Sequence, residues 1–168
     1  MTAAAIPAPE TKVGVKDALV NLYDKFGEAT WVFATYVVDN GLAVTADRLM
    51  DTPGTYTSAP DECGWGTGTP SFSATSTELD NEVALDLSTG SGARTAGTES
   101  TQTTSTTGDT YQVVATKTAS GPGTVTEAGI FDNNTIGSGV AFLLGDFTGI
   151  PLLSSDSIEF TCKAQFTN

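Results

Sequence analysis

The second half of the chain alternates apolar and polar residues, and this pattern constrains the fold more than any other feature. In the last segment the residues two apart are apolar, namely Ile158, Phe160, Cys162, Ala164 and Phe166. Successive side chains of a strand point to opposite faces, so this spacing predicts a strand with one buried face. Turn residues separate it from three further candidate strands, at 110–119, 124–131 and 140–144, and from a short apolar run at 150–153 that Pro151 interrupts. Such closely spaced strands predict a mainly β fold, an antiparallel β-sandwich of jelly-roll-like character.

One amphipathic helix is expected near the N-terminus, over residues 13–27. Apolar residues recur there at three- and four-residue intervals, which is the spacing of one helix face: Val15, Ala18, Leu19, Leu22, Tyr23 and Phe26. Gly27 suits the position that follows a helix. A single helix cannot bury its apolar face alone, so we expect it to pack on a sheet or on a partner subunit.

Residues 30–39 are rich in aromatic and β-branched residues, which favours a strand. The Asn40-Gly41 pair that follows is a strong local signal for a β-hairpin turn. We therefore expect a return strand at 42–45.

The middle of the chain carries glycine-rich and polar segments. Residues 63–70 read CGWGTGTP, and we interpret them as a tight loop that packs Trp65 against the end of the sandwich. A phosphate-binding loop would need a basic residue and a following helix, which this segment lacks. Thr77 could cap a short helix reaching Val83. Residues 88–108 are rich in Ser, Thr and Gly, so we expect a long loop there.

The length of 168 residues favours one domain. We place a single β-sandwich domain at 13–168, preceded by a flexible arm at 1–12. The arm is rich in alanine and proline, and we expect it to order only against a neighbouring chain.

The net charge of −13 argues against nucleic acid as a partner, because phosphate binding needs clustered Lys and Arg. The first residues lack the basic and apolar regions of a signal peptide, so we expect synthesis in a cytoplasm. An apolar run long enough to span a membrane is also missing, so we expect no membrane partner.

The residue types present argue against catalysis. The chain contains no histidine, which excludes Ser-His-Asp and Cys-His arrangements. A pair of carboxylates could hydrolyse a glycoside, and Glu82 with Asp86 would be such a pair only if that segment were helical. Without a supporting motif we assign no catalytic residue and expect no enzyme.

No cofactor or metal residue is assigned either. Two loop clusters carry side chains of the calcium-ligand type, Asp132-Asn133-Asn134 and Asp61-Glu62, but turn chemistry accounts for both. Cys63 and Cys162 are 99 residues apart, and cytosolic synthesis favours two buried free thiols over a disulfide.

A series of short motifs resembles a known family. They are Gly66–Pro70 (GTGTP), Thr77-Glu78-Leu79 with Glu82, Gly123–Asp132 (GTVTEAGIFD), Ala141–Leu144 with Phe147 and Ile150, and Asp156–Thr161 (DSIEFT). Together they resemble small β-sandwich virion proteins of tailed bacteriophages. The resemblance covers residues 64–168, and the segments at 13–27 and 30–39 lie outside it.

The resemblance implies a non-enzymatic structural component of a tail, collar, fibre base or capsid decoration. It implies other virion proteins as partners, a location in the virion after synthesis in the host cytoplasm, and a homo-oligomer, for which we expect a trimer.

A different reading is a carbohydrate-binding or adhesin module for host attachment. In that case Trp31, Trp65 or Tyr56 would stack on a glycan of the host surface. An exposed ring among these three would favour this reading over the structural one.

Overall fold

The computed structural model describes residues 14–23, 29–34, 36–49, 56, 58–69, 71–87 and 90–167. The predicted arm at 1–12 lies outside the described residues.

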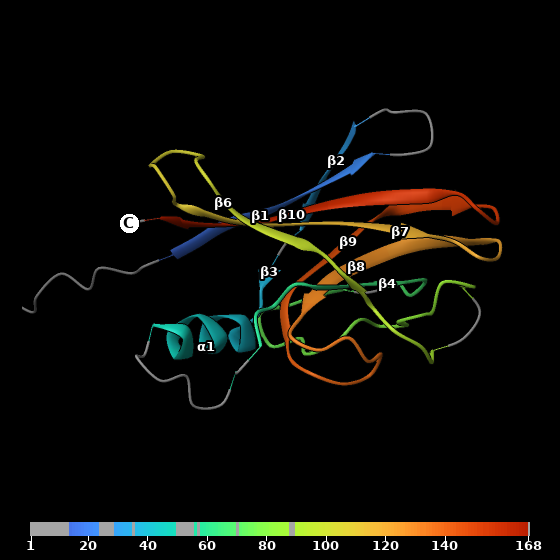
Figure 1. The fold of residues 1–168 in the computed structure, drawn as a ribbon, viewed down its shortest axis with the longest axis horizontal. Coiled ribbons are helices and arrows are strands. Elements are labelled where there is room, and N and C mark those ends of the chain that lie inside the picture. The colour runs from blue at the N-terminus through green and yellow to red at the C-terminus, as the bar shows by residue number, and fades with distance from the viewer. Residues whose placement is uncertain are drawn as a thin grey trace, which may run out of the picture.

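Two antiparallel five-stranded sheets form the molecule (Figure 1). The first sheet has the order β2-β1-β10-β7-β6, and the second has the order β3-β9-β8-β4-β5. The bounds are β1 Gly14–Tyr23, β2 Ala29–Ala34, β3 Tyr36–Val37, α1 Asp39–Arg48, β4 Glu62–Gly66, β5 Thr95–Ala96, β6 Thr98–Gln102, β7 Thr110–Thr118, β8 Gly123–Phe131, β9 Ala141–Leu152 and β10 Ser157–Thr167. The predicted mainly β sandwich is therefore confirmed.

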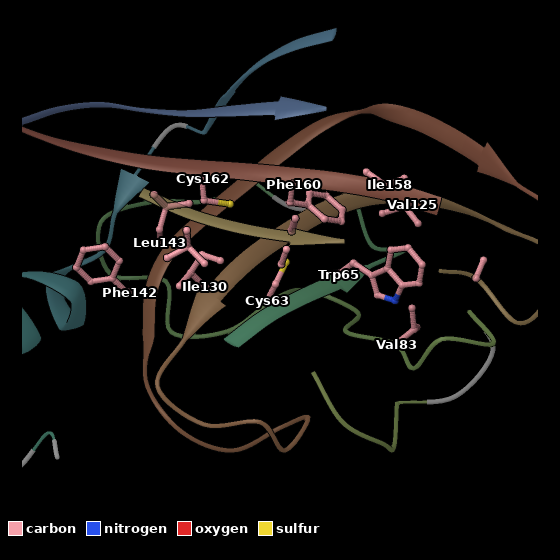
Figure 2. Packing of buried hydrophobic residues seen from close by; sticks show 14 of the residues in the cluster. Cys63, Trp65, Val83, Val125, Ile130, Phe142, Leu143, Ile158, Phe160 and Cys162 are labelled. Atoms are coloured by element: carbon pink, nitrogen blue, oxygen red, sulfur yellow. The ribbon is translucent and has the colours of Figure 1, made fainter. Parts of the chain in front are cut away.

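The main core lies between the two sheets (Figure 2). Phe160 of β10 faces Trp65 of β4 edge-on, with ring centroids 6.4 Å apart. Ile158, Cys162 and Ala164 are buried on the same side of β10, as the alternating pattern predicts. The strands predicted at 110–119, 124–131 and 140–144 are present, and the last of these is longer than predicted, because β9 continues through the apolar run at 150–153 as far as Leu152.

The predicted helix at 13–27 is wrong in its described part, because residues 14–23 form strand β1. Ala18, Val20 and Leu22 are two apart, so the apolar spacing fits a strand as well as a helix. Pairing decides between them, because β1 forms antiparallel ladders with both β10 and β2. Tertiary context overrides local helix preference here.

The Asn-Gly hairpin is also wrong, and so is its return strand at 42–45. The expected strand at 30–39 is present as β2 and β3, but Asp39 begins helix α1. Gly41 is buried in this helix, and a side chain there would meet the carbonyl oxygen of Phe142 in β9. Val44 is buried in the main core. Packing of α1 against β9 therefore outweighs the local preference of Asn-Gly for a turn.

Three predictions for the middle of the chain need correction. Residues 63–66 belong to strand β4 rather than a loop, although Trp65 is buried as expected. Residues 77–83 are irregular, with a turn at 80–81, in place of a short helix, and Glu82 makes an isolated bridge to Gly66. The expected loop at 88–108 contains β5 and β6, because the polar strand β6 pairs along β7. In that range residues 88 and 89 lie outside the described part.

A layer of loops covers the face of the second sheet that points away from the main core. Ala128 and Ile130 of β8 belong to the main core, whereas Phe131 belongs to a second cluster on the opposite face. That second cluster consists of Val38, Leu79, Phe131, Ala141 and Leu144, with Phe72 packed against it. Residues 67–69, 71–87, 90–94 and 132–140 supply the loops, so these irregular stretches are anchored to the sheet.

Candidate functional site

The carboxylate of Glu127, in the middle of β8, is fully buried and binds the loop layer. Its Oε1 accepts hydrogen bonds from the backbone N–H groups of Gly68 (3.1 Å) and Asn81 (2.8 Å). Its Oε2 accepts one from the N–H of Asp80 at 2.8 Å. Beside it, the Thr126 hydroxyl donates to the Gly68 carbonyl oxygen at 2.6 Å. One buried side chain thus ties together two separate stretches of the loop layer.

Two glycines of the GTGTP motif are required by this arrangement. A Cβ at Gly66 would meet Glu127 Oε1 and would lie 2.6 Å from the carbonyl oxygen of Asn81. A Cβ at Gly68 would lie 2.6 Å from Asp80 Oδ2 and 2.7 Å from Glu127 Oε1. Real Cβ atoms do not approach other atoms so closely, so the loop can reach the carboxylate only with glycine at both positions.

A second buried charge, Arg94, joins the two loops above Phe131. Its Nε and Nη2 donate to the two carboxylate oxygens of Glu82 at 2.7 Å and 2.8 Å. Its Nη1 donates to the carbonyl oxygens of Asn133 and Ser138, both at 2.7 Å. The guanidinium carbon lies 3.5 Å from the centre of the Phe131 ring. Because the fork geometry of arginine serves all these partners at once, the buried ion pair is hydrogen-bonded inside the protein.

Lys117 of β7 is buried between the sheets, with 1% of its surface exposed. Its Nζ donates to the Cys63 carbonyl oxygen at 3.1 Å and to the Thr95 hydroxyl at 3.4 Å, and it lies 5.2 Å from the Trp65 ring centre. Burial lowers the pKa of this ammonium group below its usual value. The folded state therefore holds the Lys117 proton less tightly than the unfolded state does.

We predict that the contribution of Lys117 to stability increases with pH. In the window from its lowered folded pKa up to 10.5 the unfolded state binds more protons, so the free energy of unfolding rises with pH. In this window the free energy of unfolding of the wild type, relative to that of Lys117→Met, should rise by at most about 1.4 kcal/mol per pH unit. Denaturant unfolding of both proteins at pH 7, 8, 9 and 10 measures the difference, in which the other titrating groups cancel. A difference that falls as the pH rises would contradict the prediction.

The residues considered for glycan stacking do not form an exposed platform among those described. Trp65 is fully buried, and its indole N–H donates to the Ala84 carbonyl oxygen at 3.1 Å. Tyr56 is half-buried and packs against the main core. The side chain of Trp31 lies outside what the structure describes.

Of the two candidate metal clusters, the one at 132–134 makes turn contacts, whereas in the other Glu62 begins strand β4. Asp132 Oδ1 accepts the Val140 N–H at 2.6 Å and Asn133 Oδ1 accepts the Thr135 N–H at 2.8 Å, which is turn chemistry. Burial raises the pKa of both Asp61 and Glu62, and Oε2 of Glu62 is buried without a hydrogen-bond partner. Among the described residues no three His, Cys, Asp or Glu side chains come together as a metal site would require.

Residues 82–86 are not helical, so Glu82 and Asp86 do not share a helix face, and Glu82 pairs with Arg94. Both cysteines are free and buried, as expected. Burial raises the pKa of the Cys63 thiol to about 12 and that of Cys162 well above its usual value. Since the thiolate is the reactive form, neither cysteine is suited to act as a nucleophile.

Sequence reasoning missed the roles of Glu127, Arg94 and Lys117. Each is a single charged residue in an otherwise uncharged segment. Glu127 lies in the strand TVTEAGIF, and Arg94 lies in a Ser/Thr/Gly-rich stretch. A lone charge in an otherwise buried strand indicates that the charged group has a hydrogen-bonding partner inside the protein, because an unpaired buried charge is very costly. The partners themselves lie 12 to 59 residues away along the chain, so the pattern does not reveal them.

No protein-family model, curated protein or solved structure matches this chain. In the part of the chain that the structure describes, no helix has the length and apolarity needed to cross a membrane.

Proposed function

We propose that this chain is a structural component of a tailed-phage virion and acts through contacts with other protein subunits. The observation that carries the proposal is that the separate motifs of the resemblance interlock in space. Glu127 of TEAGIFD holds Gly68 of GTGTP and also holds Asp80 and Asn81, which follow the TEL segment. Phe131 of the same strand lies under the Arg94–Glu82 pair. The shared residues therefore build one rigid unit.

The chemistry of the described site agrees with a structural role. The buried charges Glu127, Arg94 and Lys117 direct their hydrogen bonds to backbone groups or to other side chains of the same chain. Such networks fix one arrangement of loops, and a fixed surface is what repeated assembly of identical subunits needs. The alternative of a glycan-binding module has less support, because Trp65 is inside the core.

The test is to locate the protein in particles. Tailed-phage particles are produced from the genome that encodes this chain and are purified on a density gradient. They are then labelled with gold-conjugated antibody raised against the folded protein. We expect label at a constant position on the particle, and we expect peptides of this chain in the particle fraction by mass spectrometry. Antibody preabsorbed with the purified protein is the control. A protein abundant in the lysate but absent from purified particles would contradict the proposal.

A further inference from the structure

An open, largely apolar pocket of about 560 Å³ lies where α1 meets β6, β7 and β10. Three aromatic side chains line it, those of Tyr111, Phe142 and Phe166. The Tyr111 and Phe142 rings meet edge-on, with centroids 5.7 Å apart. Leu49, another lining residue, is 84% exposed. The volume is within the range of pockets that bind small ligands or short peptide segments.

The polar groups at the pocket are few and most have internal partners. The Tyr111 hydroxyl lies 2.8 Å from Glu99 Oε1 and 3.0 Å from the carbonyl oxygen of Pro60. With the hydroxyl satisfied, the ring offers its apolar surface to the pocket. Among the described lining residues the charged ones are Glu99, which accepts a hydrogen bond from the Tyr111 hydroxyl, and Arg48, which supplies the basic group. A suitable occupant is therefore apolar, makes few hydrogen bonds of its own and carries one acidic group.

The N-terminal segment of this chain has those properties. Residues 3–10 read AAAIPAPE, which is alanine, isoleucine and proline followed by one acid, Glu10. Proline has no N–H to satisfy, and proline-containing segments commonly dock in aromatic-lined grooves. Glu10 is complementary in charge to Arg48. The sequence of the segment thus fits the chemistry of the pocket.

The position at which this segment joins the fold is also compatible with binding in the pocket of a second copy. Gly14, the first residue of β1, pairs with Thr167, and Val15 pairs with the pocket residue Phe166. The chain that precedes Gly14 therefore starts beside the pocket. A segment that continued the line of β1 would lead away from the sheet, and thirteen residues can extend roughly 40 Å. Entry into the pocket of the same copy would need a sharp reversal, whereas a second copy lies within reach.

From these observations we infer that residues 3–10 of one copy bind in the aromatic-lined pocket of a second copy. The inference rests on the proposed function, because it supplies the contact by which identical subunits of a virion component would join. In this contact one copy supplies the segment and the other supplies the pocket, so the contact is head-to-tail and closes into a ring if the rotation between subunits allows it.

Disulfide trapping between two full-length variants tests the inference. One variant carries Ala8→Cys in the segment, and the other carries Thr101→Cys, an exposed residue of β6 at the pocket. After equimolar mixing and mild oxidation we expect a disulfide-linked dimer that contains one of each variant. The native thiols are buried and do not compete. Ser154→Cys, in the exposed turn at the opposite end of β10, replaces Thr101→Cys as the matched control and should give little dimer.

Charge reversal, introduced into the two cysteine variants, gives a second measurement that tests the proposed ion pair between Glu10 and Arg48. Arg48→Glu should reduce the rate of trapping about two- to fivefold, and adding Glu10→Arg should restore it. If Ala8→Cys/Thr101→Cys on one chain yields only an internally linked monomer, the segment binds its own copy and the inference is wrong. Equal trapping at position 154 would also overturn it. Gold label on particles without selective trapping would overturn this contact and leave the proposed function standing.

Discussion

Replacing Arg94 by methionine is expected to lower the free energy of unfolding by about 3–5 kcal/mol, the range measured when one partner of a buried ion pair is removed. The substitution leaves the Glu82 carboxylate buried without its partner. It also removes the donors to the carbonyl oxygens of Asn133 and Ser138. Methionine retains much of the packing over Phe131, so the loss reports the polar contacts. Urea unfolding followed by tryptophan fluorescence measures the effect, because Trp65 is in the core.

Three further variants establish the cause. Arg94→Lys keeps the charge but cannot serve both carboxylate oxygens and both carbonyl groups, so it should be intermediate. Arg94→Met combined with Glu82→Gln should recover part of the loss, since no buried charge is left unpaired. Lys163→Met, on the partly exposed face of β10, is the matched control and should change stability by less than about 0.5 kcal/mol. A loss of below about 1 kcal/mol for Arg94→Met would show that the pair is not a structural anchor.

The predictable part of the fold is the part in which local pattern and tertiary packing agree. In β10 the spacing of two places Ile158 and Phe160 on one face, and both are buried there. In β1 the apolar residues fit the spacing of a helix and that of a strand equally well. Only the pairing with β2 and β10 determines that the segment is a strand. In α1 a strong turn signal at Asn40-Gly41 is overridden because Gly41 allows close packing on β9.

The site was less accessible to sequence reasoning than the fold. Its contacts join residues far apart in the chain, such as Glu127 with Gly68 and Lys117 with Cys63. Composition indicates that charges are few in the second half, but it does not say which of them are buried. The GTGTP motif could be recognised, yet the reason for its glycines becomes visible only when the Glu127 carboxylate is in place.

Removing the Glu127 carboxylate should produce the second large effect, about 3 kcal/mol for Glu127→Ala. Three backbone N–H groups, those of Gly68, Asp80 and Asn81, lose a charged acceptor. Each such bond contributes about 1.5–3 kcal/mol, but the contributions are not additive, and the two groups nearer the surface can rehydrate. The loss should appear first in the loop layer. Hydrogen exchange at the amides of residues 68, 80 and 81 should therefore accelerate by a larger factor than exchange at the amides that pair β8 with β9.

Glu127→Gln separates the charge from the shape of the side chain. The amide keeps one acceptor oxygen but presents its NH₂ group to a backbone N–H, so we expect a loss smaller than that of alanine and above about 1 kcal/mol. Glu159→Ala is the matched control, because Glu159 is half-buried on the face of β10 opposite to Ile158 and Phe160, and it should leave both stability and amide exchange nearly unchanged. If Glu127→Ala left the exchange of the loop amides unchanged, the carboxylate would not be what fixes the loops. The interlocked motifs would then lose the physical link on which the proposal of a rigid assembly unit depends.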